Sequence, residues 1–434
     1  MREGCCSPCW RDLRDQAGYG APTRPLTGLA QLAWDEGMLA HGLEVAREAA
    51  DRPARGRRRQ PRAVLAAMLV DLWLLDEAEA VVEDAAAEAG DEPVWGVEIG
   101  VLRARLCLAA GRSDRVAEHA EAALAAARVL EAPGPAVSGP ARSALSVLAL
   151  ASLRAGDLPR AVRYAKGEPG RWSWGVPAHT RLRSELVAGR IAEARHGAAG
   201  AMGPLGGVYA ALPRHTAALT CEPAAAAWLV RTAMAAGEPE RADTVAEAAS
   251  RLARRNPGLP APSVPAVAAV HARGLREGDA EALGRAVAGY ADPWARGSAA
   301  EDLGVLLGAG DHQRDPATES LRTALACYGT AGATRDAARV RGRLRRLGER
   351  RRHWVRTDRP VSGWASLTGT ERAVCDLVAQ GLTNRNAAAQ LFVSEHTVAF
   401  HLRQVFRKLG IRSRVELAVL AAQENGHRDG RSLR

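Results

Sequence analysis

A helix expected between Ser394 and Gly410 carries side chains that could bind the edges of base pairs. One face of this helix is apolar and is formed by Val398, Leu402, Val405 and Leu409. At about 100° per residue, the opposite face carries His396, Phe400, Arg403 and Arg407. Arginine can bind two acceptor atoms of guanine at once, and an apolar ring can contact the methyl group of thymine. The pattern therefore predicts a helix that binds duplex DNA.

Polar and basic residues also occur where this helix and its neighbours are expected to begin or end. Side chains and free backbone N–H groups at helix ends commonly bind phosphate, which positions a protein on DNA without reading its sequence. Together with His396 and Arg407, the residues expected to contact phosphate are Thr383, Asn384, Arg385, Thr397, Lys408, Arg412 and Arg414.

The sequence offers little support for enzymatic chemistry. A nucleotide-binding P-loop needs Gly-Lys followed by Ser or Thr, but of the two lysines Lys166 precedes Gly and Lys408 precedes Leu. Neither a Ser/His/Asp nor a Cys/His arrangement stands out. Cys6 and Cys9 have the spacing of half a zinc site, but no second pair follows. We therefore predict a protein that is not an enzyme and has no metal or other cofactor.

Positive charge is concentrated near the end of the chain. Residues 341–434 hold 19 Arg and Lys against 8 Asp and Glu, so their net charge is +11, against +10 for the whole chain and −1 for residues 1–340. A local basic excess is typical of a surface that binds a polyanion, because each cation placed on a phosphate releases counterions. A solvated arginine-rich tail would give the same count, so charge alone does not decide between the two.

Residues 367–423 divide into four short predicted helices. Each begins at a side chain suited to capping, and these residues are Thr368, Thr383, Ser394 and Ser413. Gly381 and Gly410 are expected to end the first and the third helix. A short helix, a tight turn and a longer helix form a helix-turn-helix, whose second helix enters the major groove.

Residues 367–418 closely resemble the LuxR-type DNA-binding domain. The segments that carry the resemblance include Leu367-Thr-Gly-Thr-Glu371, Val378-Ala-Gln-Gly-Leu-Thr-Asn384, Val393-Ser-Glu-His-Thr397 and Lys408-Leu-Gly-Ile-Arg412. The resemblance implies base contacts at Ala399, Phe400 and Arg403. It also implies phosphate contacts near Thr383, Arg385, Thr397 and Arg407.

For the fourth helix, the resemblance implies dimerisation around residues 415–422. One recognition helix covers about half of an operator, so two half-sites one helical turn apart need two copies of the chain. Leu417, Leu420 and Ala421 have a spacing suited to an apolar contact. We therefore expect a homodimer on double-stranded DNA, with its contact at Val415, Leu417, Leu420 and Ala421.

Residues 24–348 show the punctuation of paired helices. Apolar segments meet at short turns, where a left-handed glycine would end one helix and a polar residue would begin the next. These glycines are Gly37, Gly111, Gly156, Gly237, Gly278 and Gly310. Residues 75–78 are expected to follow a further turn, whereas 132–140 and 196–222 are interpreted as loops or weak repeats. A period of about 40 residues is typical of tetratricopeptide-like or HEAT-like arrays, which usually bind partners.

This helical part resembles, more weakly, the tetratricopeptide-like half of the large ATP-binding LuxR regulators of actinobacteria. In that family an ATPase precedes the helices. Because no P-loop is found here, the resemblance implies a shortened member, a group of naturally short relatives or a truncated gene.

We therefore predict an all-α protein in which a tetratricopeptide-like array is followed by a four-helix LuxR-type helix-turn-helix domain. The expected parts are a disordered tail (1–23), a helical-repeat region that binds an effector or partner (24–348), a linker (349–366), the DNA-binding domain (367–425) and a disordered tail (426–434). No run of about 18 apolar residues lacks a charge, so no membrane span is expected.

The predicted function is that of a cytoplasmic, nucleoid-associated transcription regulator that binds operator DNA. The effector of the helical repeats could be a protein or a small molecule. One alternative is a protein-interaction scaffold whose degenerate helix-turn-helix no longer binds DNA. Another is the remnant of a signal-transduction ATPase regulator that acts with a separate nucleotide-binding subunit. Operator binding by residues 360–434 separates the first alternative from our prediction.

Overall fold

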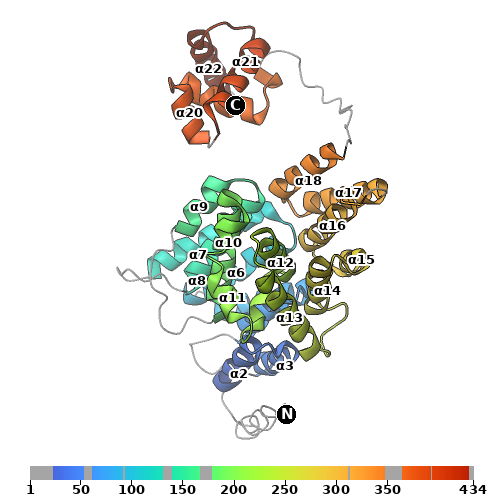
Figure 1. Ribbon diagram of the computed structural model, residues 1–434. Helices are drawn as coiled ribbons and strands as arrows, with labels where there is room; N and C mark the ends of the chain where they lie inside the picture. The colour runs from blue at the N-terminus through green and yellow to red at the C-terminus, as the bar shows by residue number, and fades with distance from the viewer. Residues whose placement is uncertain are drawn as a thin grey trace. The chain divides into compact units, whose positions relative to one another are not determined.

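The computed structural model describes residues 23–52, 61–90, 93–130, 139–166, 178–310, 313–347, 364–391 and 393–429. They fall into two compact units, one within Met1–Glu349 and the other within Arg350–Arg434. Every regular element in these ranges is a helix (Figure 1), which confirms the all-α prediction. Among the described helices, none has the length and apolar character needed to cross a membrane. Cys6 and Cys9 lie outside the described residues.

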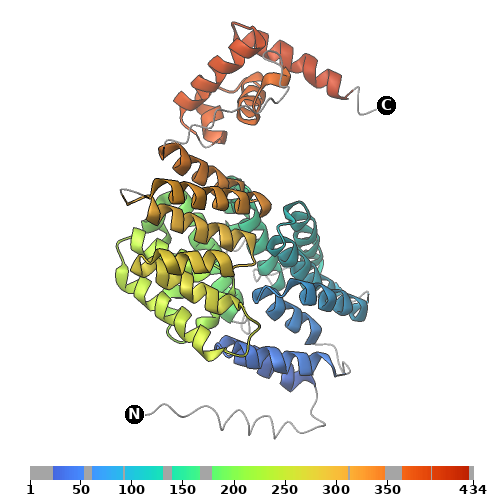
Figure 2. The same ribbon diagram turned by 90° about the vertical axis from the view of Figure 1, so that its right-hand side faces the viewer.

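The first unit is built from helices that mostly pack against their neighbours along the chain (Figures 1 and 2). In chain order they are α2 (Thr23–Asp35), α3 (Leu39–Ala50), α4 (Pro61–Asp71), α5 (Leu75–Ala89), α6 (Pro93–Ala109), α7 (Ser113–Leu130), α8 (Gly139–Arg154), α9 (Leu158–Lys166), α10 (Ala178–Ala201), α11 (Gly206–Ala211), the 3-10 helix η1 (Thr216–Thr220), α12 (Ala225–Ala235), α13 (Pro239–Arg255), α14 (Val264–Glu277), α15 (Ala280–Gly289), α16 (Pro293–Leu307), α17 (Arg314–Thr330) and α18 (Thr334–Arg346). The tetratricopeptide-like character of this array stays a prediction.

Positive φ angles mark the turns between paired helices, as the glycine pattern predicts. Five of the six predicted positions have φ between +69° and +85°, and they are Gly37, Gly111, Gly156, Gly237 and Gly278. Gly310 does not adopt this conformation, so the sixth assignment is wrong. The further turn expected before residues 75–78 is present between α4 and α5 and uses Trp73 (φ +60°). A turn that the sequence did not single out uses Gly332 (φ +63°) between α17 and α18.

The segment 196–222, interpreted from its glycines as a loop or weak repeat, is largely helical. It holds the end of α10, all of α11 and all of η1, with non-helical backbone at Gly197 (φ +74°). Leu205, Val208 and Leu212 are buried in the core of the unit, and this burial favours compact structure over an exposed loop. Of the other predicted loop, residues 139 and 140 begin α8, and the rest lies outside the described residues.

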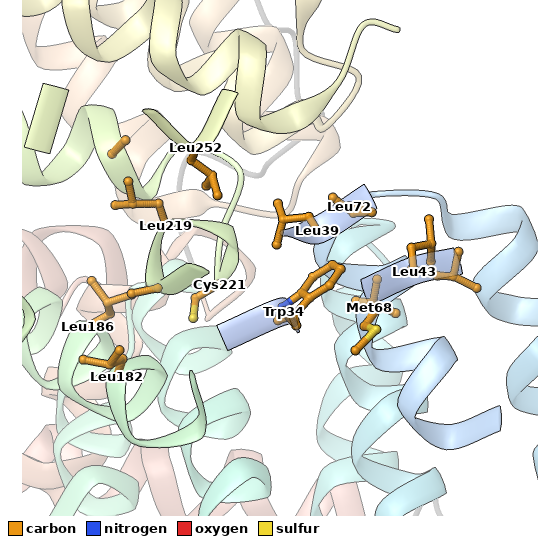
Figure 3. Close-up of a cluster of buried hydrophobic side chains, with 14 of the residues drawn as sticks. Trp34, Leu39, Leu43, Met68, Leu72, Leu182, Leu186, Leu219, Cys221 and Leu252 are labelled. Carbon is orange, nitrogen blue, oxygen red and sulfur yellow. The ribbon is translucent and has the colours of Figure 1, made fainter. Parts of the chain in front are cut away.

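Helices early in the unit contact segments that follow about half a chain later. The side chain of Asn256 accepts a hydrogen bond from the Ala40 amide at 3.0 Å and donates one to the Gly37 carbonyl at 2.8 Å. Likewise, Trp73 donates from Nε1 to Asp292 Oδ2 at 3.0 Å. The apolar core also joins the two parts (Figure 3), because one cluster contains Trp34, Leu39, Leu43, Met68, Leu182, Leu186, Leu219 and Leu252.

A buried polar network surrounds His271 on α14. The imidazole is fully buried, with Nε2 at 3.0 Å from Asp302 Oδ2 and Nδ1 at 3.3 Å from the Tyr290 hydroxyl. Asp302 also pairs with Arg231 at 2.5 Å. Burial lowers the pKa of His271, and the hydrogen bond to Asp302 offsets this only in part. The folded protein therefore holds this histidine in its neutral form.

We expect His271 to make the free energy of unfolding depend on pH below about 6.5, the usual imidazole pKa in an unfolded chain. Below this value the unfolded chain binds a proton that the folded His271 does not, so stability falls by at most about 1.4 kcal/mol per pH unit. His271→Asn should remove this contribution, as measured by chemical denaturation at pH 7.5, 6.5 and 5.5. The exposed control His196→Asn should keep the wild-type slope. An unchanged slope in His271→Asn would contradict the prediction.

Candidate nucleic-acid interface

The second unit is described from Trp364 onward and consists of short helices. They are the 3-10 helix η2 (Trp364–Ser366), α19 (Gly369–Ala379), α20 (Asn384–Leu391), α21 (Glu395–Leu409) and α22 (Arg414–Asp429). The four predicted α-helices are therefore confirmed. Two boundaries need correction. Trp364 packs against the core of this unit rather than lying in a linker, and α22 continues past residue 425 because a helix tolerates Gly426 at a cost of only about 1 kcal/mol.

Local side chains set the ends of these helices. The Thr368 amide donates to Glu371 Oε2 at 2.7 Å, and the Glu371 amide donates to Thr368 Oγ1 at 3.2 Å, which completes the predicted capping box. Ser394 accepts from the Thr397 amide at 3.1 Å, and α21 ends at Gly410 in the left-handed conformation (φ +70°). The helix that carries the candidate DNA contacts is thus held at both ends.

One face of α21 lies in the core of this unit, as the spacing predicts. Val398 and Val405 are fully buried, Leu402 is 6% exposed and Leu409 packs against the same cluster. Residues from α19, α20 and α22 complete the cluster, among them Val374, Val378, Ala387 and Leu417. Because this side is anchored, the rotation of α21 about its axis is defined, and the opposite side must face outward.

The outward face of α21 carries the four side chains expected there. His396, Arg403 and Arg407 are exposed, and Phe400 is 50% exposed. Arg403 Nε lies 3.4 Å from the Ala399 carbonyl, and Arg407 Nη2 donates to Gln404 Oε1 at 2.5 Å. Both arginines thus keep further N–H groups for another partner, since a guanidinium has five donors. Ala399 is half-buried beside them. A ring flanked by cations can contact bases and phosphates together.

The residues expected to bind phosphate differ in how far they are free to do so. Thr383, Arg385 and Arg412 are exposed. Thr383 Oγ1 accepts from the Asn386 amide at 3.2 Å, so it caps α20. The half-buried Thr397 has its Oγ1 at 2.8 Å from Ser394 Oγ.

Lys408 is held inside the domain, which corrects its assignment as a phosphate contact. Its Nζ donates to Glu371 Oε2 at 2.6 Å and to the Ser366 carbonyl at 3.2 Å, and its side chain is 21% exposed. Burial acts to raise the pKa of Glu371, but the hydrogen bonds from Lys408 and Thr368 outweigh it and hold that pKa below its usual value. Lys408 therefore ties the end of α21 to the start of α19.

Arg414 and Asn384 also bind each other. Arg414 donates through Nη2 to Asn384 Oδ1 and through Nη1 to the Leu382 carbonyl at 3.0 Å. These contacts hold the start of α22 against the start of α20. We therefore leave both residues out of the phosphate ligands proposed below.

The exposed apolar residues of α22 are not those that the spacing suggested. Leu417 is fully buried and Ala421 is 6% exposed, so neither is free to contact a second copy of the chain. Leu420 is half-buried. Val415 and Val419 are 74% and 53% exposed, and a separation of four residues places them on one face. Of the four residues predicted to form the dimer contact, only Val415 has a largely exposed side chain.

Breaking the Lys408–Glu371 pair should destabilise this unit. We expect Lys408→Met to lower its local free energy of unfolding by about 1–2 kcal/mol, less than the 3–5 kcal/mol typical of fully buried pairs because Lys408 retains some contact with solvent. Hydrogen exchange of peptides from residues 364–421 in the full chain would measure the change. Arg412→Met, at an exposed position, is the control. Equal protection in both variants would disprove the prediction.

Comparison with known proteins confirms the resemblance of this unit. Residues 365–421 match the GerE family model, described as bacterial regulatory proteins of the luxR family. Rv0890c of Mycobacterium tuberculosis, named as a putative HTH-type transcriptional regulator, is 54% identical over 65 residues, which is 15% of this chain and 7% of that protein. The nitrate/nitrite response regulator NarP of Escherichia coli is 45% identical over 60 residues, 14% of this chain and 28% of NarP.

A third relative is the DNA-binding transcriptional activator DevR/DosR of Mycobacterium tuberculosis. It is 34% identical over 89 residues, which is 20% of this chain and 36% of that protein. The chain thus spans a small part of the length of the relatives it matches.

Proposed function

We propose, from the luxR-family domain at residues 365–421, that this chain is a transcription regulator that binds operator DNA. The observation that carries the proposal is the outward face of α21. Phe400 is half exposed between basic residues, does not belong to the apolar core formed by the described residues, and meets the His401 ring edge-on at 5.6 Å. A base pair offers both an apolar methyl group and acceptor atoms to such a surface. In this proposal α21 lies in the major groove and α20 crosses the backbone.

Sequence recognition is assigned to the middle of α21. Arg403 binds the two acceptors of a guanine, and Phe400 contacts the methyl group of a thymine. Ala399 lies one residue earlier on the helix and is half-buried, so it adds a small apolar contact to a base.

Positioning on the DNA backbone is assigned to side chains around this centre. Arg407 follows Arg403 by one turn on the same exposed face, and Arg385 and Arg412 are exposed near the ends of α20 and α22. These contacts add affinity that depends strongly on salt. The complete set that we propose for phosphate is Thr383, Arg385, His396, Thr397, Arg407 and Arg412.

The remaining parts of the proposal concern assembly and control. Two copies of the chain bind two half-sites of one operator and meet through α22. The helical unit within residues 24–348 receives a protein or small-molecule effector and has no enzymatic activity. The protein would act in the cytoplasm, at the nucleoid.

Selection of bound duplexes from a random DNA library by the full chain tests the proposal. We expect enrichment of a two-fold symmetric motif with half-sites about 10 base pairs apart, and affinity that falls steeply with salt. The double variant Phe400→Ala/Arg403→Ala should select no motif. Arg254→Gln, on the exposed surface of α13, is the control and should select the wild-type motif. Failure of the wild-type chain to enrich any sequence would refute the proposal.

A further inference from the structure

The helical unit contains a partly open cavity of about 60 Å³, lined by both apolar and charged side chains. It lies where α4, α6, α8 and α10 meet residues 220–223 and Asp292, so distant parts of the chain form its wall. Cys221, at the cavity wall, is among the residues drawn in Figure 3. The interior of the unit is mostly apolar. The cavity wall nevertheless contains three arginines, Arg105, Arg154 and Arg183.

Two of these arginines share one carboxylate oxygen. Arg105 Nη2 lies 2.6 Å from Asp71 Oδ1, and Arg183 Nη2 lies 2.7 Å from the same atom. The side chains of Asp71, Arg105 and Arg183 are 7%, 12% and 16% exposed. Burial, and after it the neighbouring Arg183, lowers the pKa of Arg105, whereas the carboxylate of Asp71 raises the pKa of Arg183.

The third arginine shares its carboxylate with a further cation. Arg154 Nη2 lies 3.6 Å from Glu222 Oε2, which Arg190 Nη2 approaches to 2.9 Å. The side chains of these three residues are between 8% and 9% exposed. The other carboxylate of the wall belongs to Asp292, which already accepts from Trp73 Nε1 at 3.0 Å and caps α16 through the Ala295 amide at 2.6 Å. Asp71 and Glu222 therefore each serve two guanidinium groups.

Some donors of the wall lack an acceptor. In the part of the chain that the structure describes, Nε of Arg105 and Nε of Arg154 are buried and have no hydrogen-bond partner. Glu222 Oε2 lies within ion-pair distance of Arg154 and Arg190 but also accepts no hydrogen bond. Arg154 is 8% exposed, and its guanidinium stacks on the ring of Trp294 at 4.7 Å, which provides no acceptor atom. A buried charged donor without an acceptor is unfavourable, and an oxygen atom bound in the cavity would remove this cost.

We propose that this cavity binds a small oxyanion between Arg105, Arg154 and Arg183. The anion supplies acceptor atoms to the unpartnered N–H groups and balances the positive charge shared around Asp71 and Glu222. One water molecule needs about 10–15 Å³ of such space, so the cavity holds roughly four to six non-hydrogen atoms. Inorganic phosphate and oxalate have this size, whereas a nucleotide does not. Binding of the anion does not depend on the proposed binding of DNA.

Calorimetric titration of the full chain with inorganic phosphate, and separately with oxalate, tests the proposal at constant ionic strength. We expect saturable binding of at least one of the two anions. Tighter binding of phosphate would identify a phosphate as the ligand, and tighter binding of oxalate would identify a carboxylate. Arg154→Gln should weaken that binding at least tenfold, while Arg154→Lys, which keeps the charge, should weaken it less. The exposed control Arg254→Gln should bind as the wild type does. Binding of neither anion, or equal binding by Arg154→Gln, would overturn the proposal.

A second measurement uses the wild-type chain, in case Arg154→Gln does not fold. Cys221 lines the cavity as a thiol, because burial raises its pKa to about 11. The bound anion should slow modification of Cys221 by methyl methanethiosulfonate at least tenfold, as followed by mass spectrometry. Cys327, which is half-buried and does not line the cavity, should react at an unchanged rate. Equal slowing of both cysteines, or of neither, would count against the site.

Discussion

Arg403→Ala should weaken binding to the selected operator by about 1–3 kcal/mol, roughly a 5- to 150-fold loss of affinity, and should relax the preference at one base pair. The physical reason is that an arginine on the exposed face of α21 can bind guanine N7 and O6 together, a match that no other base offers. Fluorescence anisotropy with the operator, with single-base variants of it and with scrambled DNA would measure the change. The affinity for scrambled DNA should change little by comparison.

Arg407→Ala is the matched control for Arg403, because it removes the same charge one turn further along the same exposed face. Because Arg407 is a proposed phosphate contact, Arg407→Ala should weaken binding to all sequences about equally. The substitution should also reduce the slope of log affinity against log salt by about one unit. Both variants are measured at two salt concentrations. If Arg403→Ala lowers the affinity for operator and scrambled DNA equally, Arg403 merely positions the helix and its assignment to base recognition is wrong.

Val419→Glu should weaken binding to a two-fold symmetric operator on the order of 100-fold, because two copies of α22 would place like charges against each other at a cost of several kcal/mol. The structure selects this position because Val415 and Val419 are exposed on one face of α22. Leu420→Glu, which the helix spacing alone suggests, would place a charge at a half-buried position and disturb the fold as well. Affinity for the symmetric operator and for an isolated half-site would be compared.

The half-site measurement separates loss of the dimer from loss of the fold. Val419→Glu should bind a single half-site as the wild type does, because that complex needs one copy of the domain. Gln380→Glu adds the same charge at the end of α19 and is the control for a general electrostatic effect. An equal loss on the symmetric operator and the half-site would exclude dimerisation through Val419.

Sequence reasoning predicts features that depend on contacts close along the chain. A capping side chain binds an amide two or three residues away, so Thr368, Ser394 and the glycine at 410 locate helix ends without knowledge of the fold. The 3.6-residue period likewise assigns the buried and exposed faces of α21, because its apolar stripe is unbroken. Of the six glycines in the helical unit for which the same local rules predict a left-handed turn, five have a positive φ.

By itself, then, the sequence determined the helical class, the four helices of the luxR-family domain and the face of α21 on which Phe400 and Arg403 lie. Tertiary structure alone decided that Lys408 pairs with Glu371, 37 residues away, instead of remaining free for phosphate. It also decided that α22 buries Leu417 and exposes Val419, because a helix apolar on several sides can be packed in more than one rotation. The cavity lined by Arg105, Arg154 and Arg183 likewise could not be predicted from the sequence. Its charges come from helices far apart in the chain, and no local period relates residues that meet only when those helices pack.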